Sequence, residues 1–271
     1  MKFENINVYN FKNSLRGMRN PKESYSKIDS IFGYCKKEDY HDIVIEWYKN
    51  TYNTIPMDID YHSINEICEY SILNEDKKSG IIEYALIGPN DMKLAKSLIQ
   101  GGSEHRKFLR QIFVSVDITA PLYFFKEFDT YKVSVTANST STMHTIHKKP
   151  ITRSCFETDD YHPELTLIDS NSKIDIRTDL FINNLEQIRQ LYLQYIKEAE
   201  KDKKYAPIAK QYWKELIRWL PESWLQTRTV TMNYENLLSM YHQRKNHKQS
   251  EWSVHFINFI KSLPYAADFI I

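Results

Sequence analysis

Apolar and polar side chains alternate along residues 112–119, and this period of two predicts a strand with one buried face. Ala120-Pro121 follows and predicts the start of an aromatic helix over residues 122–131, because proline is tolerated in the first helical turn. A polar loop rich in Asn, Ser and Thr is expected after this helix, over residues 138–144. The apolar face of the strand comprises Ile112, Val114, Val116 and Ile118.

Earlier in the chain the apolar spacing is mostly helical. Residues 38–50 and 57–72 predict short helices, and residues 81–87 predict a further strand. A helix is expected around residues 92–99, capped by Asn90 or Asp91 and stopped by Gly101-Gly102. Residues 1–30 are polar, and we expect this region to be less regular than the rest of the chain.

In the second half the period changes to 3.6, after an irregular polar stretch over residues 148–178 in which a short strand is predicted at 165–168. Residues 180–196 and 208–217 predict two amphipathic helices, the second halted at Pro221. Asn233 is a predicted cap for a helix through Arg244, and Ser250 for one through Leu263. The whole predicts an α+β domain with a helical second half.

Composition narrows the functional classes. The chain has 271 residues, is 42% hydrophobic, and carries a net charge of +1, which argues against a general nucleic-acid binder. No apolar run approaches the length of a membrane span, and the first residues do not have the pattern of a signal peptide. The three cysteines are scattered without a Cys-x-x-Cys motif, so we expect free thiols in a cytoplasmic protein.

One block of the sequence resembles the flavin-dependent thymidylate synthases. Their signature is Arg-His-Arg, a short spacer and Asn-Glu-x-Ser-x-Arg-Tyr, preceded by a strand and an Ala-Pro-led helix. Here Thr130-Tyr131-Lys132 stands at the Arg-His-Arg position, and Asn138 and Ser141 match the Asn and Ser. This sequence departs from the signature at three further positions, where Ser139, Met143 and His144 stand in place of Glu, Arg and Tyr.

A second block continues the resemblance in the right order. Leu220-Pro221 is followed by Asn233 and Arg244 at the offsets where the family has Leu-Pro, Asn and Arg. Residues 247–251 are similar to the family's Ala-Gln-x-Glu run with one residue deleted.

The resemblance implies a thymidylate synthase-complementing-protein-like fold, in which an antiparallel sheet packs with helices and the C-terminal half is helical. It implies one domain over residues 1–271, with a divergent N-terminal region of about residues 1–80. It also implies a homotetramer whose sites form between subunits. The Asn-, Lys- and Ile-rich usage suits an AT-rich bacterial or phage genome.

The activity implied is transfer of a one-carbon group to a pyrimidine deoxynucleotide, dUMP or a related one. FAD is the implied cofactor, with NADPH and methylenetetrahydrofolate as co-substrates, and no metal is expected. The implied catalytic residues are Arg244, Ser141 and Glu127. The implied cofactor-binding residues are Lys132, Asn233, Tyr131 and Asn138. The implied substrate-binding residues are Glu127, Ser139, Ser141, Thr142, Arg218 and Arg244.

The implied site needs several cations or helix N-termini, because FAD and a nucleoside monophosphate together carry three phosphates. Lys132 and Arg244 are the matching cations, and lysine gives up the bidentate fork of arginine. Arginines elsewhere could replace the cations that are missing; the candidates are Arg16, Arg19, Arg106, Arg110, Arg218 and Arg228.

Glu127 stands where the family has a substrate-contacting Gln. A carboxylate accepts hydrogen bonds and does not donate them, so it would favour an amino-bearing base such as cytosine. The alternative is that Glu127 is a solvated helix residue.

A purely structural role stays open for several of these residues. The residues of 138–142 could make only local turn bonds, Asn233 could be only a helix cap, and Arg244 could pair with Glu251 or Glu235. Three functions follow: a divergent flavin enzyme, a nucleotide-binding protein that kept the fold and lost flavin chemistry, or an interaction protein.

Overall fold

The computed structural model describes residues 1–54, 59–158 and 174–271, and these form two compact units. Unit 1 comprises Met1, Thr119–Thr130 and Asn138–Arg228. Unit 2 comprises Lys2–Ile118, Tyr131–Ala137 and Thr229–Ile271. The single domain expected from the resemblance stays a prediction.

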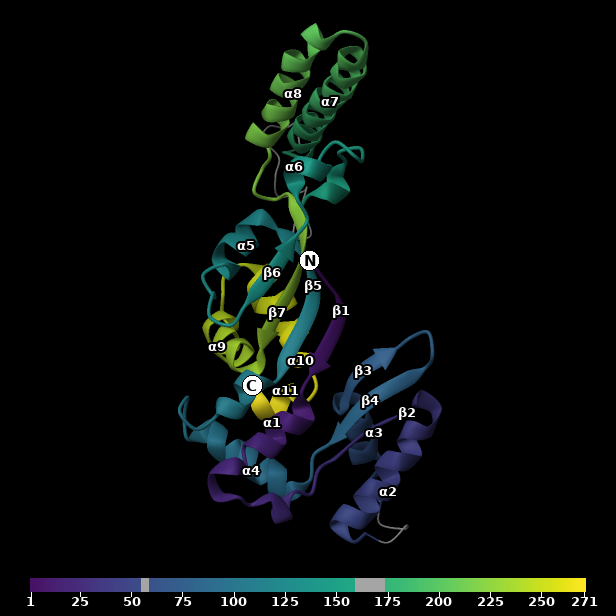
Figure 1. Cartoon of the computed structure of the whole chain (residues 1–271), viewed down its shortest axis with the longest axis vertical. Helices are drawn as coiled ribbons and strands as arrows, with labels where there is room; N and C mark the ends of the chain where they lie inside the picture. The colour runs from purple at the N-terminus through teal and green to yellow at the C-terminus, as the bar shows by residue number, and fades with distance from the viewer. Residues whose placement is uncertain (55–58, 159–173) are drawn as a thin grey trace. The chain divides into compact units, whose positions relative to one another are not determined.

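Strands β1, β5, β7 and β6 form a four-stranded sheet in that order (Figure 1). The predicted alternation in β5 is confirmed, because Val114, Val116 and Ile118 are all fully buried. β7, beside β5, was not predicted, since its polar Thr-rich sequence lacks a clear apolar face, and it adds a strand to the expected helical second half. The strands are β1 (Lys2–Tyr9), β5 (Phe113–Pro121), β6 (Thr136–Ser139) and β7 (Leu225–Asn233).

A second sheet belongs to unit 2 alone. Its order is β2-β4-β3, antiparallel, with Ile31 opposite Leu86 and Lys36 opposite Ile81. The predicted helices at 38–50 and 57–72 are confirmed as α2 and α3, and they share a closed apolar core with this sheet. The elements are β2 (Ile31–Lys36), α2 (Tyr40–Tyr52), α3 (Tyr61–Tyr70), β3 (Ile72–Asp76) and β4 (Ile81–Leu86).

Helix α4 (Pro89–Gln100) confirms the predicted helix but corrects its cap. Gly88 is the N-cap residue, and Asn90 and Asp91 lie within the first turn. The Asp29 carboxylate accepts from the amides of Asn90 and Asp91 at 2.7 and 3.0 Å. An aspartate distant in sequence therefore does the capping, which local spacing could not reveal.

Asp91 instead serves a buried ion pair. Its Oδ1 lies 2.6 Å from Arg19 Nη2, and the two side chains are 1% and 4% exposed. The Ser30 hydroxyl donates to the same carboxylate at 2.7 Å. The polar N-terminal segment is thus ordered by this pair and by α1 and β1, against expectation. The remaining elements here are α1 (Phe11–Gly17) and the 3₁₀ helices η1 (Asn20–Lys22), η2 (Tyr25–Lys27), η3 (Lys37–Asp39) and η5 (Lys107–Gln111).

The C-terminal segment of unit 2 confirms the helix to Arg244 and modifies the next one. Asn233 caps α9 (Tyr234–Arg244) in a reciprocal capping box with Asn236. Ser250 makes no side-chain capping bond, and the helix after it begins as a π-helix. The elements after α9 are η9 (Glu251–Phe256), α10 (Ile257–Lys261) and α11 (Ala266–Phe269).

Unit 1 contains the long helical hairpin that the 3.6 period predicted, with α7 and α8 packed side by side (Figure 1). Glu186 and Arg189 on α7 form a two-bond ion pair, and Glu186 also accepts from the Ile151 amide at 2.7 Å. The predicted strand at 165–168 lies outside the described residues. The elements of unit 1 are α5 (Leu122–Phe128), α6 (Thr142–Thr145), η6 (Arg153–Cys155), α7 (Ile174–Lys201), η8 (Lys203–Tyr205) and α8 (Ala206–Arg218).

Candidate functional site

Tyr131 and Arg244, one from each block of the resemblance, meet in unit 2. Arg244 Nε donates to the Tyr131 hydroxyl oxygen at 2.6 Å, and that hydroxyl donates to Gln243 Oε1 at 2.9 Å. The Arg244 guanidinium carbon also lies 4.9 Å from the ring centre of Trp252, within cation–π range.

The local sequence explains how these residues are positioned. Arg244 is the last residue of α9, where the carbonyl end of the helix dipole favours a cation. The Asn236 side chain, one turn into α9, donates to the Val133 carbonyl at 2.9 Å and holds the segment after Tyr131 against the helix. Three hydrogen bonds therefore join residues 131–133 to α9.

Lys132 and Asn233 are the other predicted cofactor residues of unit 2. Lys132 is exposed next to Tyr131. Asn233 is 2% exposed, and its side-chain oxygen accepts from the Asn236 amide at 2.9 Å. The capping role considered for Asn233 is confirmed, and its cofactor role stays a prediction.

The hydroxyl-rich segment lies in unit 1 and is not a plain loop. Asn138 and Ser139 are exposed in β6 at the edge of the four-stranded sheet, and Thr142 opens the short helix α6. Ser141 occupies the N-cap position without making a side-chain cap bond. The loop prediction is therefore wrong, because the pairing of β6 with β7 extends the chain at a position where composition suggests a turn.

Glu127 and Arg218 also belong to unit 1. Glu127 is half-buried near the end of α5, where its backbone carbonyl accepts from the Thr130 hydroxyl at 2.7 Å. Arg218 Nη1 contacts the Glu215 carboxylate one turn earlier on α8, and the Arg218 side chain is 55% exposed. Arg218 is therefore a surface cation in this structure.

The arginines considered as replacement phosphate ligands all have protein partners. Arg16 stacks on Tyr25 and Arg110 donates to the Ser103 carbonyl. Arg19, Arg106 and Arg228 pair with Asp91, Glu235 and Asp129, respectively. The pairing of Arg106 with Glu235 also removes Glu235 as the principal partner of Arg244. These contacts indicate structural roles for the five arginines.

Trp252 was missed by the sequence argument. It follows directly after residues 247–251, the last part of the second block, and is fully buried at the Arg244 guanidinium. An aromatic residue next to a matched segment is too common to single out without the contact.

Metal ligation and membrane insertion have no support in the described part of the chain. Within it, no group of three or more His, Cys, Asp or Glu side chains is arranged to hold a metal ion. Nor does any helix among the described residues combine the length and apolarity needed to cross a membrane.

No protein-family model matches the sequence. No curated protein matches it either. A crystal structure of flavin-dependent thymidylate synthase ThyX from Helicobacter pylori, complexed with FAD and dUMP, is similar with a TM-score of 0.43 and 14% identity, over 89% of this chain and 97% of that chain. A second Helicobacter pylori ThyX structure with FAD and dUMP gives 0.42 and 13%, over 90% and 96%. Similarity at this level gives no residue correspondence.

Proposed function

We propose that this chain is a divergent flavin-dependent thymidylate synthase-like protein that binds FAD and a pyrimidine deoxynucleotide and transfers a one-carbon group to the nucleotide. The observation that carries the proposal is the 2.6 Å hydrogen bond from Arg244 to Tyr131. It brings together two sequence blocks that were paired only by their order and spacing. A shared phosphate site requires this proximity.

The residues present fit a phosphate-bearing cofactor. Arg244 is oriented by a phenol oxygen at Nε and by an aromatic face, and exposed Lys132 adds a second cation beside Tyr131. Arginine recognises phosphate through its planar fork and lysine acts as a point charge. Lys132 and Arg244 would therefore hold FAD phosphates, with Tyr131, Asn138 and Asn233 as the other cofactor residues. Reduced flavin supplies a hydride when bound.

The proposed substrate-binding residues are those that the resemblance implies. The hydroxyls of Ser139, Ser141 and Thr142 would donate to the nucleotide, and Glu127 would face the base. Arg218 would contribute least, because it is exposed and already paired with Glu215. NADPH and methylenetetrahydrofolate complete the proposed reaction, in a cytoplasmic homo-oligomer whose sites form between subunits.

Two measurements on the purified full chain test the proposal. We expect a yellow preparation whose flavin bands are released on denaturation, or binding of added FAD. We also expect dTMP to form from dUMP when FAD, NADPH and methylenetetrahydrofolate are supplied. A colourless protein that binds no added FAD would contradict the proposal.

The second candidate function is a nucleotide-binding protein without flavin chemistry. This function is favoured because Arg16, Arg19, Arg106, Arg110 and Arg228 each contact other groups of the protein. The implied site then has two matching cations, Lys132 and Arg244, for the three phosphates of FAD and a nucleotide. Binding of a pyrimidine nucleotide by a colourless protein that rejects FAD would select this function.

The base preference is tested separately. Calorimetric titration with dUMP and dCMP should favour dCMP if the Glu127 carboxylate faces the base, because it can accept from the cytosine amino group. Glu127→Gln should shift the preference back toward dUMP. A clear preference of the unaltered protein for dUMP would contradict this assignment.

A further inference from the structure

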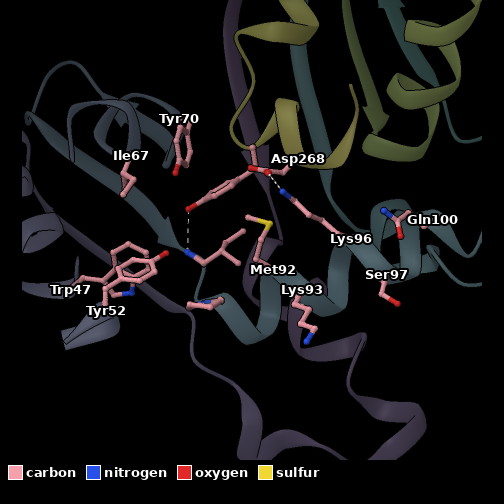
Figure 2. Close-up of a pocket in the computed structure, with 13 residues that line it drawn as sticks. Trp47, Tyr52, Ile67, Tyr70, Met92, Lys93, Lys96, Ser97, Gln100 and Asp268 are labelled. Carbon is pink, nitrogen blue, oxygen red and sulfur yellow. Dashed lines mark hydrogen bonds and ion pairs between the residues drawn. The ribbon is translucent and has the colours of Figure 1, made fainter. Parts of the chain in front are cut away.

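A pocket of about 700 Å³ lies within unit 2, where α4 meets α2, α3 and the C-terminal segment around α11 (Figure 2). Its volume is in the range of about 300–1,000 Å³ that is typical of small-molecule sites. One face of α4 lines it, with residues at helical spacing: Met92, Lys93, Lys96, Ser97 and Gln100. Neither the sequence argument nor the proposed function uses this pocket.

Aromatic side chains form much of the opposite wall. Tyr52 and Tyr70 line the pocket with 51% and 39% of their surfaces exposed. The neighbouring apolar core of α2, α3 and the β2-β4-β3 sheet is, in contrast, buried. Tyr52 packs edge-on against Trp47, with the ring centres 6.2 Å apart. Exposed faces of this kind can stack with a planar ligand.

The lining carries a net positive charge of one. Lys96 Nζ lies 2.6 Å from Asp268 Oδ1, as drawn in Figure 2, and these two charges cancel. Lys93 has no acidic partner among the residues that the structure describes. The tyrosines add no negative charge near neutral pH, because burial raises the pKa of Tyr70 to about 12, helped by Asp268, and burial also raises the pKa of Tyr52.

The nearby N-terminus of α4 does not compete for an anion. Its first free amides, those of Asn90 and Asp91, already donate to the Asp29 carboxylate. Lys93 is therefore the group in this pocket with an unmatched charge.

A buried donor lies in the same wall. Trp47 is 7% exposed, and its Nε1 has no hydrogen-bond acceptor within the described residues. Buried N–H groups are nearly always paired. Tyr52, which packs on Trp47, is the last residue of α2 and is half exposed in the same pocket.

We infer that this pocket binds a small planar aromatic molecule that carries an anionic group. Its ring lies on the Tyr52–Tyr70 wall and presents an acceptor toward Trp47 Nε1, and its anion contacts Lys93. The anion can be a phosphate or a carboxylate, since Lys93 offers the same point charge to both. This inference is independent of the proposed flavin site.

The test uses the full chain with its tryptophan indoles labelled with ¹⁵N. The probes are AMP as an aromatic phosphate, indole-3-acetate as an aromatic carboxylate, and adenosine and inorganic phosphate as the separated parts. Trp47→Phe assigns the Trp47 indole signal. Lys93→Gln removes the proposed anion contact, and Lys12→Gln, at an exposed lysine of α1, is the matched control.

At least one of the two aromatic anions should shift the Trp47 indole signal, and the separated parts should bind about tenfold more weakly. Lys93→Gln should weaken binding by about tenfold, and Lys12→Gln should leave it unchanged. The inference is overturned if neither anion moves the Trp47 signal, or if Lys93→Gln binds as tightly as the unaltered chain. A shift confined to the indole signal of Trp252, which lies against Arg244, would likewise overturn the inference.

Discussion

The two units hold the predicted site residues in different ways. In unit 2, Tyr131 and Arg244 are joined by a hydrogen bond, and the segment after Tyr131 is tied to α9. In unit 1, Asn138 and Ser139 are exposed on an edge strand, and Arg218 is exposed in a surface ion pair. Tyr131 and Arg244 of unit 2 are therefore held by contacts with each other and with α9, whereas Asn138, Ser139 and Arg218 of unit 1 are exposed to solvent.

Because of this difference, we expect the predicted site residues of the two units to contribute unequally to ligand affinity, although the spacing of the sequence motifs gives no reason to rank them. A side chain already held in place gives up little freedom when a ligand binds, whereas an exposed one must be ordered at that moment. We therefore expect Arg244 and Tyr131 to dominate anion affinity and the exposed residues of unit 1 to contribute less.

The largest expected effect is the loss of FAD affinity when Arg244 is removed. Arg244→Ala should weaken FAD binding about 100-fold, because a charge-assisted contact to phosphate contributes about 2–3 kcal/mol. Arg244→Lys should recover part of this loss, since it keeps the charge and loses the fork. Fluorescence titration with FAD measures both. Lys245→Ala, at the next residue, is the control, and equal losses in the two alanine variants would contradict the role of Arg244.

The second-largest expected effect is a loss of stability when the Glu186–Arg189 ion pair of unit 1 is broken. The bonds from Arg189, helped by the Ile151 amide and Gln190, lower the pKa of Glu186 to about 2 from its ordinary 4.5. A lowered folded pKa gives stability that is present above pH 4.5 and is lost as the pH falls toward 2. Glu186→Gln should destabilise the protein at pH 7 by about 1–2 kcal/mol, allowing for solvent screening.

Urea unfolding at several pH values measures this loss. Glu198→Gln, at a more exposed position of the same helix, is the control and should change stability by about 0.5 kcal/mol or less. An unchanged pH dependence in Glu186→Gln would show that the ion pair of α7 does not stabilise the hairpin.

Tyr131→Phe isolates the contact between the two blocks. It removes the oxygen that accepts from Arg244 Nε and keeps the ring, so FAD affinity should fall about fivefold to tenfold. Tyr9→Phe, at an exposed tyrosine of β1, should have no effect. If both variants bind FAD equally well, Tyr131 does not position Arg244.

The smallest effect is expected at Arg218. Because its ion pair with Glu215 is exposed, Arg218→Gln should change stability by less than about 1 kcal/mol and nucleotide affinity by less than about twofold. Calorimetry with the nucleotide that binds best measures the affinity. A tenfold loss of nucleotide affinity would contradict the account, because it would show that an exposed residue of unit 1 contributes strongly to binding.

The sequence predicted the elements whose periodicity is strong. The alternation of Val114, Val116 and Ile118 identified β5, and the 3.6 period identified α7 and α8. It missed β1 and β7, whose residues alternate only weakly, because their places in the sheet come from pairing with distant strands. Mixed helices and antiparallel strands agree with the predicted class, but the helical second half needs β7 added.

For the candidate site, spacing placed Tyr131 and Arg244 in one site, and the structure brings them into contact. Spacing could not reveal Trp252 beneath Arg244, or Asp29 as the cap of α4. Both depend on side chains that meet only after the chain has folded. The six replacement arginines could be judged only from their partners for the same reason.

The most direct test of the central claim is a crystal structure of the full chain with FAD and dUMP added. The account predicts phosphate density within hydrogen-bond distance of Arg244 Nη atoms and Lys132 Nζ, with the Arg244–Tyr131 contact retained. Ordered FAD bound away from these residues, or a structure in which Tyr131 and Arg244 are not in contact, would contradict it.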